Sequence, residues 1–145
     1  MFQPDVTFLA GKVLKRSLPV LAAGDQPPVA RLKRLLLPQG ELAQFYDGEE
    51  GIRYIAFLAL RAGVARGNHY HKFKEELLYL IDGEVLLVLE NIDSKLRESV
   101  LLQTGDLAYI PAGVAHALRA LKDGQAVECS PGRYDATDSY RYPLE

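Results

Sequence analysis

Short apolar runs separated by turn residues recur along the whole chain. The turns are rich in Gly, Pro and Asp and come about every eight to twelve residues. The runs between them are dominated by Val, Leu, Ile and Tyr and are too short for typical helices; they span residues 53–60, 76–81, 84–90, 98–103, 106–110 and 125–130. Evenly spaced short strands with such turns predict an all-β sandwich or barrel.

The pair Asp82-Gly83 lies between two of these runs and is the strongest local turn signal. Glycine accepts positive φ without strain, so an Asp-Gly pair suits a two-residue hairpin with a type I′ turn. The sequence therefore predicts that residues 76–81 and 84–90 are antiparallel neighbours.

The sequence pattern predicts the structure of the two ends of the chain less clearly. Residues 24–28 (GDQPP) predict a turn, and residues 29–37 (VARLKRLLL) fit a strand or a short helix equally well. The tail carries several tyrosines and could cover a barrel mouth, pack on a partner or extend into solvent. A length of 145 residues suits one domain, with N-terminal strands in 1–50, a body at about 50–130 and a tail at 131–145.

Charge and composition exclude several classes of protein. The net charge of −2 and pI near 5.9 argue against a nucleic-acid partner, which needs a basic face, and the short basic runs 12–16 and 31–34 are interpreted as solvated strand faces. No window approaches the ~20 apolar residues of a membrane span. The N-terminus is a poor secretion signal, so we expect a cytoplasmic protein. Cys129, the single cysteine, cannot form an internal disulfide and is interpreted as a buried structural thiol rather than a nucleophile.

Candidate chemistry begins at His69 and His71. Alternate side chains of a strand share a face, so both imidazoles should point the same way, with Cα atoms ~6.5–7 Å apart. A reversal at residues 72–74 would bring Glu75 or Glu76 alongside, but only one of them can face the histidines. We expect Glu76 inward and Glu75 outward.

The choice of Glu76 is consistent with the residues around it. Leu78 and Leu80 would share its inward face, whereas Glu75 would lie outward beside Lys72 and Lys74.

The remaining histidine, His116, belongs to a wider pattern. The run Gly63-x5-His69-x-His71-x4-Glu76-x6-Gly83 resembles the first motif of the cupin family, and Gly105-x5-Pro111-x-Gly113-x2-His116 resembles the second. The sequence departs from the second motif at one position, where Ala120 replaces the usual asparagine. The resemblance covers about residues 50–130. It implies a small jelly-roll β-barrel in which His69, His71, Glu76 and His116 bind one divalent metal.

The donor set by itself favours a transition metal. Imidazole and carboxylate ligands suit Zn, Mn, Fe, Ni or Cu rather than Ca or Mg, which prefer oxygen ligands. Four protein ligands would leave up to two positions of an octahedral shell open. The alternative is a barrel with a degenerate or metal-free site, in which the buried polar groups hydrogen-bond one another.

Three functions remain open at this level. Residues 66–72 (RGNHYHK) resemble a stretch of sugar-nucleotide 3,4-ketoisomerases, which implies an isomerase or epimerase acting on a carbohydrate or nucleotide-linked sugar. The alternatives are a metal-dependent dioxygenase or small-molecule lyase, and a non-enzymatic protein that binds a small ligand.

The resemblance leaves the catalytic residues unknown. A histidine could move the proton, or a metal could polarise a substrate carbonyl, and the two versions compete because a metal-bound ring nitrogen is not free as a base. Arg66 is either an anion-binding group or a surface charge. We expect a small-molecule partner and a homodimer, with residues 31–38 and the tyrosine tail as candidate contacts.

Overall fold

The computed structural model describes residues 5–22 and 32–145, and these residues form strands, turns and bends without a helix. The strands are β1 (Val6–Phe8), β2 (Val13–Ser17), β3 (Val20–Ala22), β4 (Lys33–Leu37), β5 (Gly40–Gln44), β6 (Tyr54–Leu60), β7 (Ala65–Tyr70), β8 (Glu76–Asp82), β9 (Glu84–Asn91), β10 (Arg97–Gln103), β11 (Asp106–Ile110), β12 (Val114–Ala120), β13 (Gly124–Ser130) and β14 (Tyr140–Arg141). The all-β prediction is confirmed.

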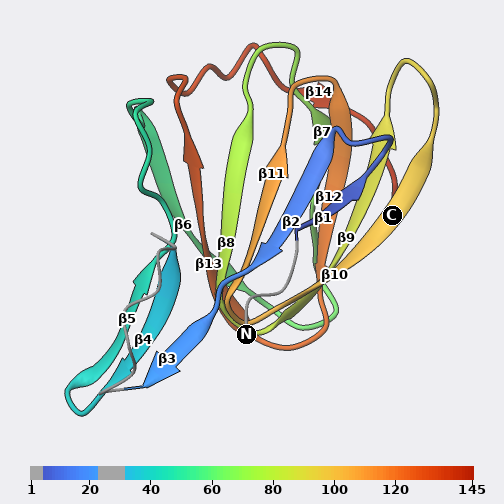
Figure 1. Cartoon of the computed structure of the whole chain (residues 1–145). Coiled ribbons are helices and arrows are strands. Elements are labelled where there is room, and N and C mark those ends of the chain that lie inside the picture. The colour runs from blue at the N-terminus through green and yellow to red at the C-terminus, as the bar shows by residue number, and fades with distance from the viewer. Residues whose placement is uncertain (1–4, 23–31) are drawn as a thin grey trace.

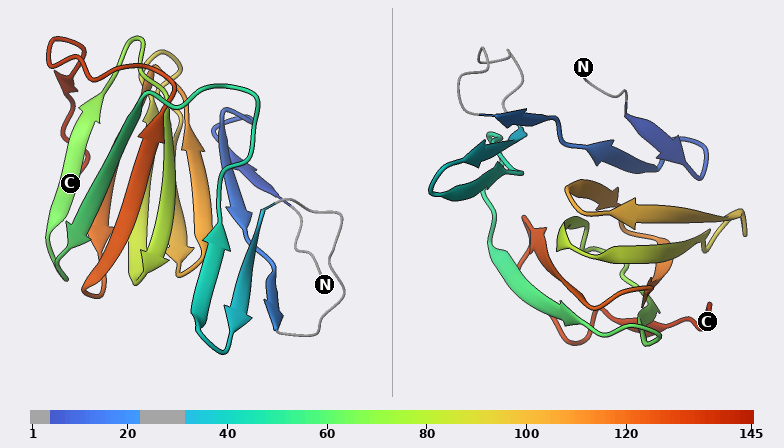
Figure 2. Two further views of the ribbon diagram at one scale, coloured as in Figure 1. Left: turned by 90° about the vertical axis from the view of Figure 1, so that its left-hand side faces the viewer. Right: turned by 90° about the horizontal axis from the view of Figure 1, so that it is seen from below.

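Two larger sheets face each other across the core (Figures 1 and 2). One has six strands in the order β1-β2-β11-β8-β13-β6, and the other has five in the order β10-β9-β12-β7-β14. Apolar side chains from both sheets fill the space between them, among them Leu78, Leu80, Leu87 and Leu118. This is a jelly-roll arrangement, as expected. Among the described strands the two sheets remain separate hydrogen-bonded units, so the body is a sandwich rather than a closed barrel.

Every apolar run predicted to be a strand is one, with boundaries that differ by at most one residue. Strand β12 was not among those runs. Its sequence, Val-Ala-His-Ala-Leu-Arg-Ala, is rich in alanine, which has low strand propensity. Hydrogen bonding to β9 on one side and β7 on the other, with burial on both faces, makes it a central strand nonetheless.

The predicted hairpin at Asp82-Gly83 is wrong. Strand β8 pairs with β11 and β13, whereas β9 pairs with β10 and β12, so the chain changes sheets at this point. Gly83 has a φ of +129° and forms a corner between the sheets, where its N–H bonds to Thr104 Oγ1 at 3.0 Å. Both flanking strands are largely apolar, and each gains more burial from two neighbours of its own than from pairing with the other.

The N-terminal part contributes β1 and β2 to the sandwich body and three further strands outside it. Residues 33–37 of the segment left open as strand or helix form β4, while residues 24–28 and 29–31 lie outside the described residues. Strands β3, β4 and β5 form a small sheet that projects from the body (Figure 1). The basic run at 12–16 lies largely in β2, as predicted, between β1 and β11.

The tail packs on its own chain. Strand β14 extends the five-stranded sheet, with Tyr140 opposite Tyr70. Leu144 and Tyr142 join Val88 and Ala115 in a second apolar cluster on the outer face of that sheet. Two backbone N–H groups, those of Leu144 and Glu145, bond to the Asn68 side chain. No helix in the described part of the chain is long and apolar enough to cross a membrane.

Candidate functional site

Strands β7 and β12 bring His69 and His116 opposite each other. The register shifts directly after this pair, because Asn68 is an extra residue on β7 and has a φ of +55°. Gly67, beside it, has a φ of +89°, and a Cβ there would come within 2.7 Å of the His116 carbonyl oxygen. This β-bulge, typical of functional sites, sets the direction in which His69 leaves the strand.

The chain then carries two more donors into the same place. His71 follows the end of β7, and Glu76 begins β8 with its side chain inward, as predicted. One donor atom from each of His69, His71, Glu76 and His116 lies within 4.8 Å of every other. The structure therefore brings together the side chains that the sequence motifs singled out.

Hydrogen bonds fix the tautomers of two of the rings. Nδ1 of His71 lies 2.5 Å from the Asp138 carbonyl, and Nδ1 of His116 lies 3.1 Å from the Val114 carbonyl. A carbonyl only accepts, so both Nδ1 atoms carry hydrogen and donate. The Nε2 atoms face Glu76 at 3.1 and 3.2 Å.

This arrangement fits a shared cation. An unprotonated Nε2 beside a carboxylate oxygen is repulsive unless a proton or a metal ion lies between them. Two ligand atoms at right angles on one ion, with bonds of ~2.1 Å, are about 3 Å apart, which agrees with the 3.1 and 3.2 Å that separate Glu76 from the Nε2 atoms of His71 and His116. His–carbonyl bonds of this kind also orient metal-ligating imidazoles in known sites.

The electrostatics of the site keep two of its donors, Glu76 and His69, available, whereas hydrogen bonds to Glu76 and to the Asp138 carbonyl outweigh burial and raise the pKa of His71. Burial alone would raise the pKa of Glu76, but the His116 and His71 rings, which donate from Nε2 when they are doubly protonated, and the charge of Lys74 hold that pKa well below its usual value. Burial, together with His116 and His71, lowers the pKa of His69 to about 4. Glu76 is thus ionised and His69 neutral near pH 7, as metal ligands must be.

Lys74 does not face outward, contrary to the sequence-based expectation. Its ammonium lies 3.2 Å from Glu76 Oε1, 3.8 Å from Glu128 Oε1 and 4.4 Å from the centre of the Tyr54 ring. Residues 71–75 form a turn, so strand alternation does not apply to them. Glu75 points the other way and accepts a hydrogen bond from the Tyr109 hydroxyl at 2.6 Å.

Glu128 and Tyr54 are interior groups that sequence reasoning missed. Glu128 lies on the core-facing side of β13, with Ala126, and its carboxylate is 3.3 Å from the Tyr54 hydroxyl. Burial and the Glu76 carboxylate raise the pKa of Glu128, partly offset by Lys74. Alternation along residues 125–130 was the available signal, but it favours the more apolar Val127 and Cys129 as the inward pair.

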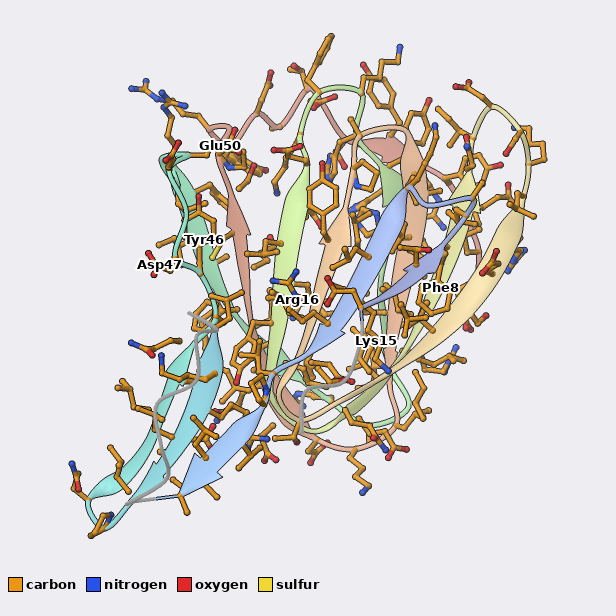
Figure 3. All side chains as sticks on the ribbon, viewed as in Figure 1. Phe8, Lys15, Arg16, Tyr46, Asp47 and Glu50 are labelled. Atoms are coloured by element: carbon orange, nitrogen blue, oxygen red, sulfur yellow. The ribbon has the colours of Figure 1, made fainter. Side chains whose placement is uncertain are left out.

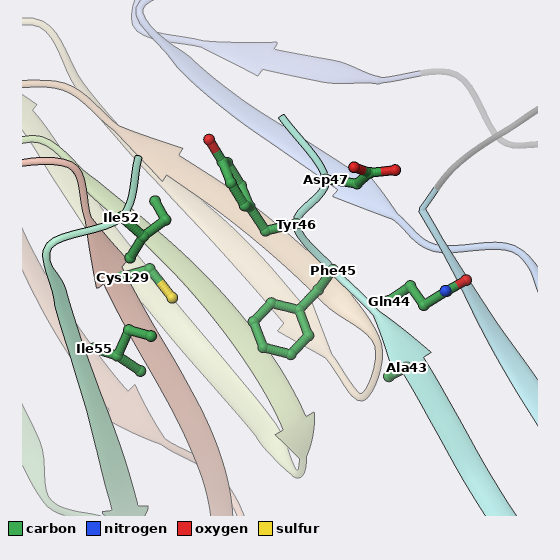
Figure 4. A pocket seen from close by; sticks show the side chains of 8 residues that line it. All are labelled: Ala43, Gln44, Phe45, Tyr46, Asp47, Ile52, Ile55 and Cys129. Atoms are coloured by element: carbon green, nitrogen blue, oxygen red, sulfur yellow. The ribbon is translucent and has the colours of Figure 1, made fainter. Parts of the chain in front are cut away.

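Cys129 faces a separate cavity on the outer side of the six-stranded sheet. It is buried, which raises the pKa of its thiol. The cavity, of about 790 Å³, lies between this sheet and the segment after β5 (Figure 4), and is lined by Ala43, Gln44, Phe45, Tyr46, Asp47, Ile52, Ile55 and Cys129. The Tyr46 hydroxyl, near its rim, donates to the Glu50 carbonyl; Figure 3 labels both residues. None of the candidate metal ligands lines this cavity.

The middle and C-terminal part of the chain matches a known protein family. The family model described as "Cupin domain" matches residues 56–129, the segment that contains all three histidines and Glu76. No protein of curated function matches the chain.

Solved structures resemble the fold over most of the chain. The dTDP-6-deoxy-D-glucose-3,5-epimerase RmlC of Legionella pneumophila, in complex with dTDP-4-keto-L-rhamnose, has a TM-score of 0.74 at 15% identity and covers 95% of this chain and 76% of its own. QdtA, a sugar 3,4-ketoisomerase of Thermoanaerobacterium thermosaccharolyticum in complex with TDP, has a TM-score of 0.68 at 19% identity, covering 90% and 88%. A 3,4-ketoisomerase of Helicobacter canadensis has a TM-score of 0.66 at 20% identity, covering 76% and 86%. At these identities the likeness establishes the fold.

Proposed function

The chain belongs to the cupin domain family, and from this membership we propose that it is a metal-binding enzyme that isomerises or epimerises a nucleotide-linked sugar. The observation that carries the proposal is the convergence of His69, His71, Glu76 and His116 within 4.8 Å. The sugar-nucleotide part is supported by the ligands and activities named for structural neighbours, the epimerase and ketoisomerases described above.

The four side chains would hold one divalent ion such as Zn, Mn, Fe or Ni. The ion would supply a Lewis acid that polarises a carbonyl oxygen of the substrate. The residues around it keep the donors ready: the Asp138 and Val114 carbonyls hold two of the rings in one tautomer.

Proton transfer then needs a group outside the ligand set. A ring nitrogen committed to a metal is not free as a base, and Glu128 is the carboxylate next to the cluster that lacks this commitment. The pKa of Glu128 is raised toward neutral pH, which favours general-base catalysis. We assign Glu128 the role of accepting the proton from the carbon next to the sugar carbonyl and returning it to carbon. Lys74 Nζ and the Tyr54 hydroxyl orient this carboxylate.

The test is hydrogen exchange at carbon. A thymidine-diphosphate-linked 4-keto-6-deoxy sugar is incubated in D₂O with protein purified without affinity nickel, whose metal content is measured beforehand. We expect exchange of the ring protons next to the keto group, seen by NMR, at a rate that follows metal content. If metal-replete protein shows no exchange, the proposal that it isomerises or epimerises such a sugar is contradicted. Oxygen uptake, or saturable binding without turnover, would favour the dioxygenase or ligand-binding alternative.

We also propose that the protein forms a homodimer. Among the described strands, β6 is an edge of its sheet, and it carries Ile55 and Phe57 outward, 69% and 61% exposed. Large apolar side chains on an unpaired edge favour association with another chain. Light scattering of the protein and of the Phe57→Lys variant would test this, with dissociation expected for the variant.

A further inference from the structure

We propose that Asp138, in the tail at 131–145, is a positioning residue for this site. It fixes both the ring of His71 and the turn that leads from His71 to Glu76. The metal-binding part of the argument rests on the proposed function. The hydrogen bonds that define the role involve only residues of this chain.

The Asp138 carboxylate holds the turn from the inside. It accepts the backbone N–H groups of residues 72, 73 and 74 at 2.8, 3.1 and 3.0 Å. Asp138 is only 6% exposed, so these charge-assisted bonds are shielded from water. The turn lacks strand hydrogen bonds of its own along this stretch, and its path from His71 to Glu76 therefore depends on Asp138.

The Asp138 carbonyl acts on the imidazole itself. It accepts the Nδ1–H of His71 at 2.5 Å, which leaves Nε2 facing Glu76. His116 is oriented in the same way by the carbonyl of Val114, but Val114 is in the same strand as His116. The orientation of His71, in contrast, depends on a segment that comes much later in the chain.

The rest of the tail holds Asp138 in place. On one side of it, the N–H of Asp138 bonds to the Asp135 carbonyl at 3.1 Å. On the other side, β14 pairs with β7, where Arg141 lies opposite His69, and the Tyr142 N–H bonds to the Asn68 carbonyl at 2.7 Å. The tail therefore fixes the ring of His71 from a segment outside β7, the strand that carries His69.

A cap that only stabilises the turn would act differently from a positioning residue. Loss of a cap lowers thermal stability but leaves a folded protein with the same His71 tautomer and the same metal affinity. Loss of a positioning residue releases the His71 ring, so both tautomers become populated and metal affinity falls even where the fold persists.

The experiment compares Asp138→Ala and Asp138→Asn with Asp135→Ala, a change in the same tail at an exposed carboxylate that bonds only within its own turn. Histidine ring ¹⁵N–¹H spectra report the His71 tautomer, Zn²⁺ titration reports affinity, and the melting temperature reports the fold. Asp138→Asn keeps one acceptor oxygen and is the milder variant if Asp138→Ala does not fold.

The substitutions leave the backbone carbonyl of residue 138 in place but remove the carboxylate that ties it to the turn after His71, so we expect the carbonyl and the His71 ring to move apart. Both Asp138 variants should then lose the single Nδ1–H tautomer of His71 and bind Zn²⁺ about 10- to 100-fold more weakly. The Asp135→Ala variant should match the unsubstituted protein in both readouts. An Asp138 variant that folds with the tautomer unchanged, and with Zn²⁺ affinity within about twofold where the unsubstituted protein binds Zn²⁺, would overturn the proposal. If the unsubstituted protein binds no Zn²⁺, the metal site of the proposed function fails, and the ring spectra still decide the role of Asp138.

Discussion

The backbone of Gly67 passes so close to the His116 carbonyl oxygen that a Cβ on Gly67 would lie 2.7 Å from it. This contact joins β7 to β12 at the bulge that directs His69 toward His116. The bulge therefore requires glycine for space as well as for its φ of +89°.

Gly67→Ala is expected to separate the two strands locally and to cost about 1–3 kcal/mol of stability, with metal capacity reduced because His69 moves. The matched control is Gly63→Ala, since Gly63 has a φ of +80° but a Cβ there would have no atom within 4 Å of it. The Gly63→Ala variant should lose about 1 kcal/mol of stability and keep its metal capacity unchanged. Chemical denaturation and elemental analysis measure both effects, and equal metal content in the two variants would contradict the role of the bulge.

The neighbouring glutamates give a sharp test of the ligand set. Glu76→Gln should abolish stoichiometric metal, because it removes the carboxylate shared by His71 and His116. Glu75→Gln should leave metal content unchanged. It should instead lower the pKa of Tyr109, which burial and Glu75 raise to about 12. Metal analysis and ultraviolet titration of the phenol check the pair; metal loss in Glu75→Gln alone would reverse the assignment.

The histidine ligands themselves give a simpler expectation. His69→Ala and His116→Ala should each abolish stoichiometric metal binding, since each removes one of the converging donors. Elemental analysis of folded variants measures this. Metal content equal to that of the unsubstituted protein would show that the residue is no ligand.

Removal of metal should expose the titration of His69. With a chelator present, the pKa of His69 is about 4 in the folded protein against 6.5 as the reference value for the unfolded chain. The folded state then binds fewer protons between these values, so its stability is full above pH 6.5 and falls as the pH drops toward 4. We expect His69 to lower the free energy of unfolding by about 1–2 kcal/mol across this pH range, after allowance for solvent screening. Urea denaturation of the unsubstituted protein and His69→Gln across this window measures it; identical pH slopes would argue against the lowered pKa.

Glu128 is expected to affect turnover without affecting the metal. Glu128→Gln keeps the shape of the side chain and should slow deuterium exchange into the substrate by about 10²- to 10⁴-fold, since a carboxamide cannot act as the base. Metal stoichiometry should be unchanged, because Glu128 is not among the converging donors. Exchange at the rate of the unsubstituted protein would move the base to another residue.

The sequence alone determined six strands of the sandwich body and the ligand candidates. Alternation and turn residues are local properties, so residues 53–60 or 106–110 could be assigned without knowing their partners. The spacing of His69, His71, Glu76 and His116 within two motifs of a known family was equally visible. These positions belong to short segments whose backbone geometry depends mainly on their own residues.

Tertiary structure decided which strands pair and which polar groups meet. Gly83 looks like a hairpin residue in sequence, but β8 and β9 each find better partners in opposite sheets. The inward positions of Lys74 and Glu128 and the reach of Asp138 back to His71 also depend on segments distant in sequence. Burial and hydrogen bonding between such segments outweigh local preference, because they remove far more surface and satisfy more polar groups than any single turn.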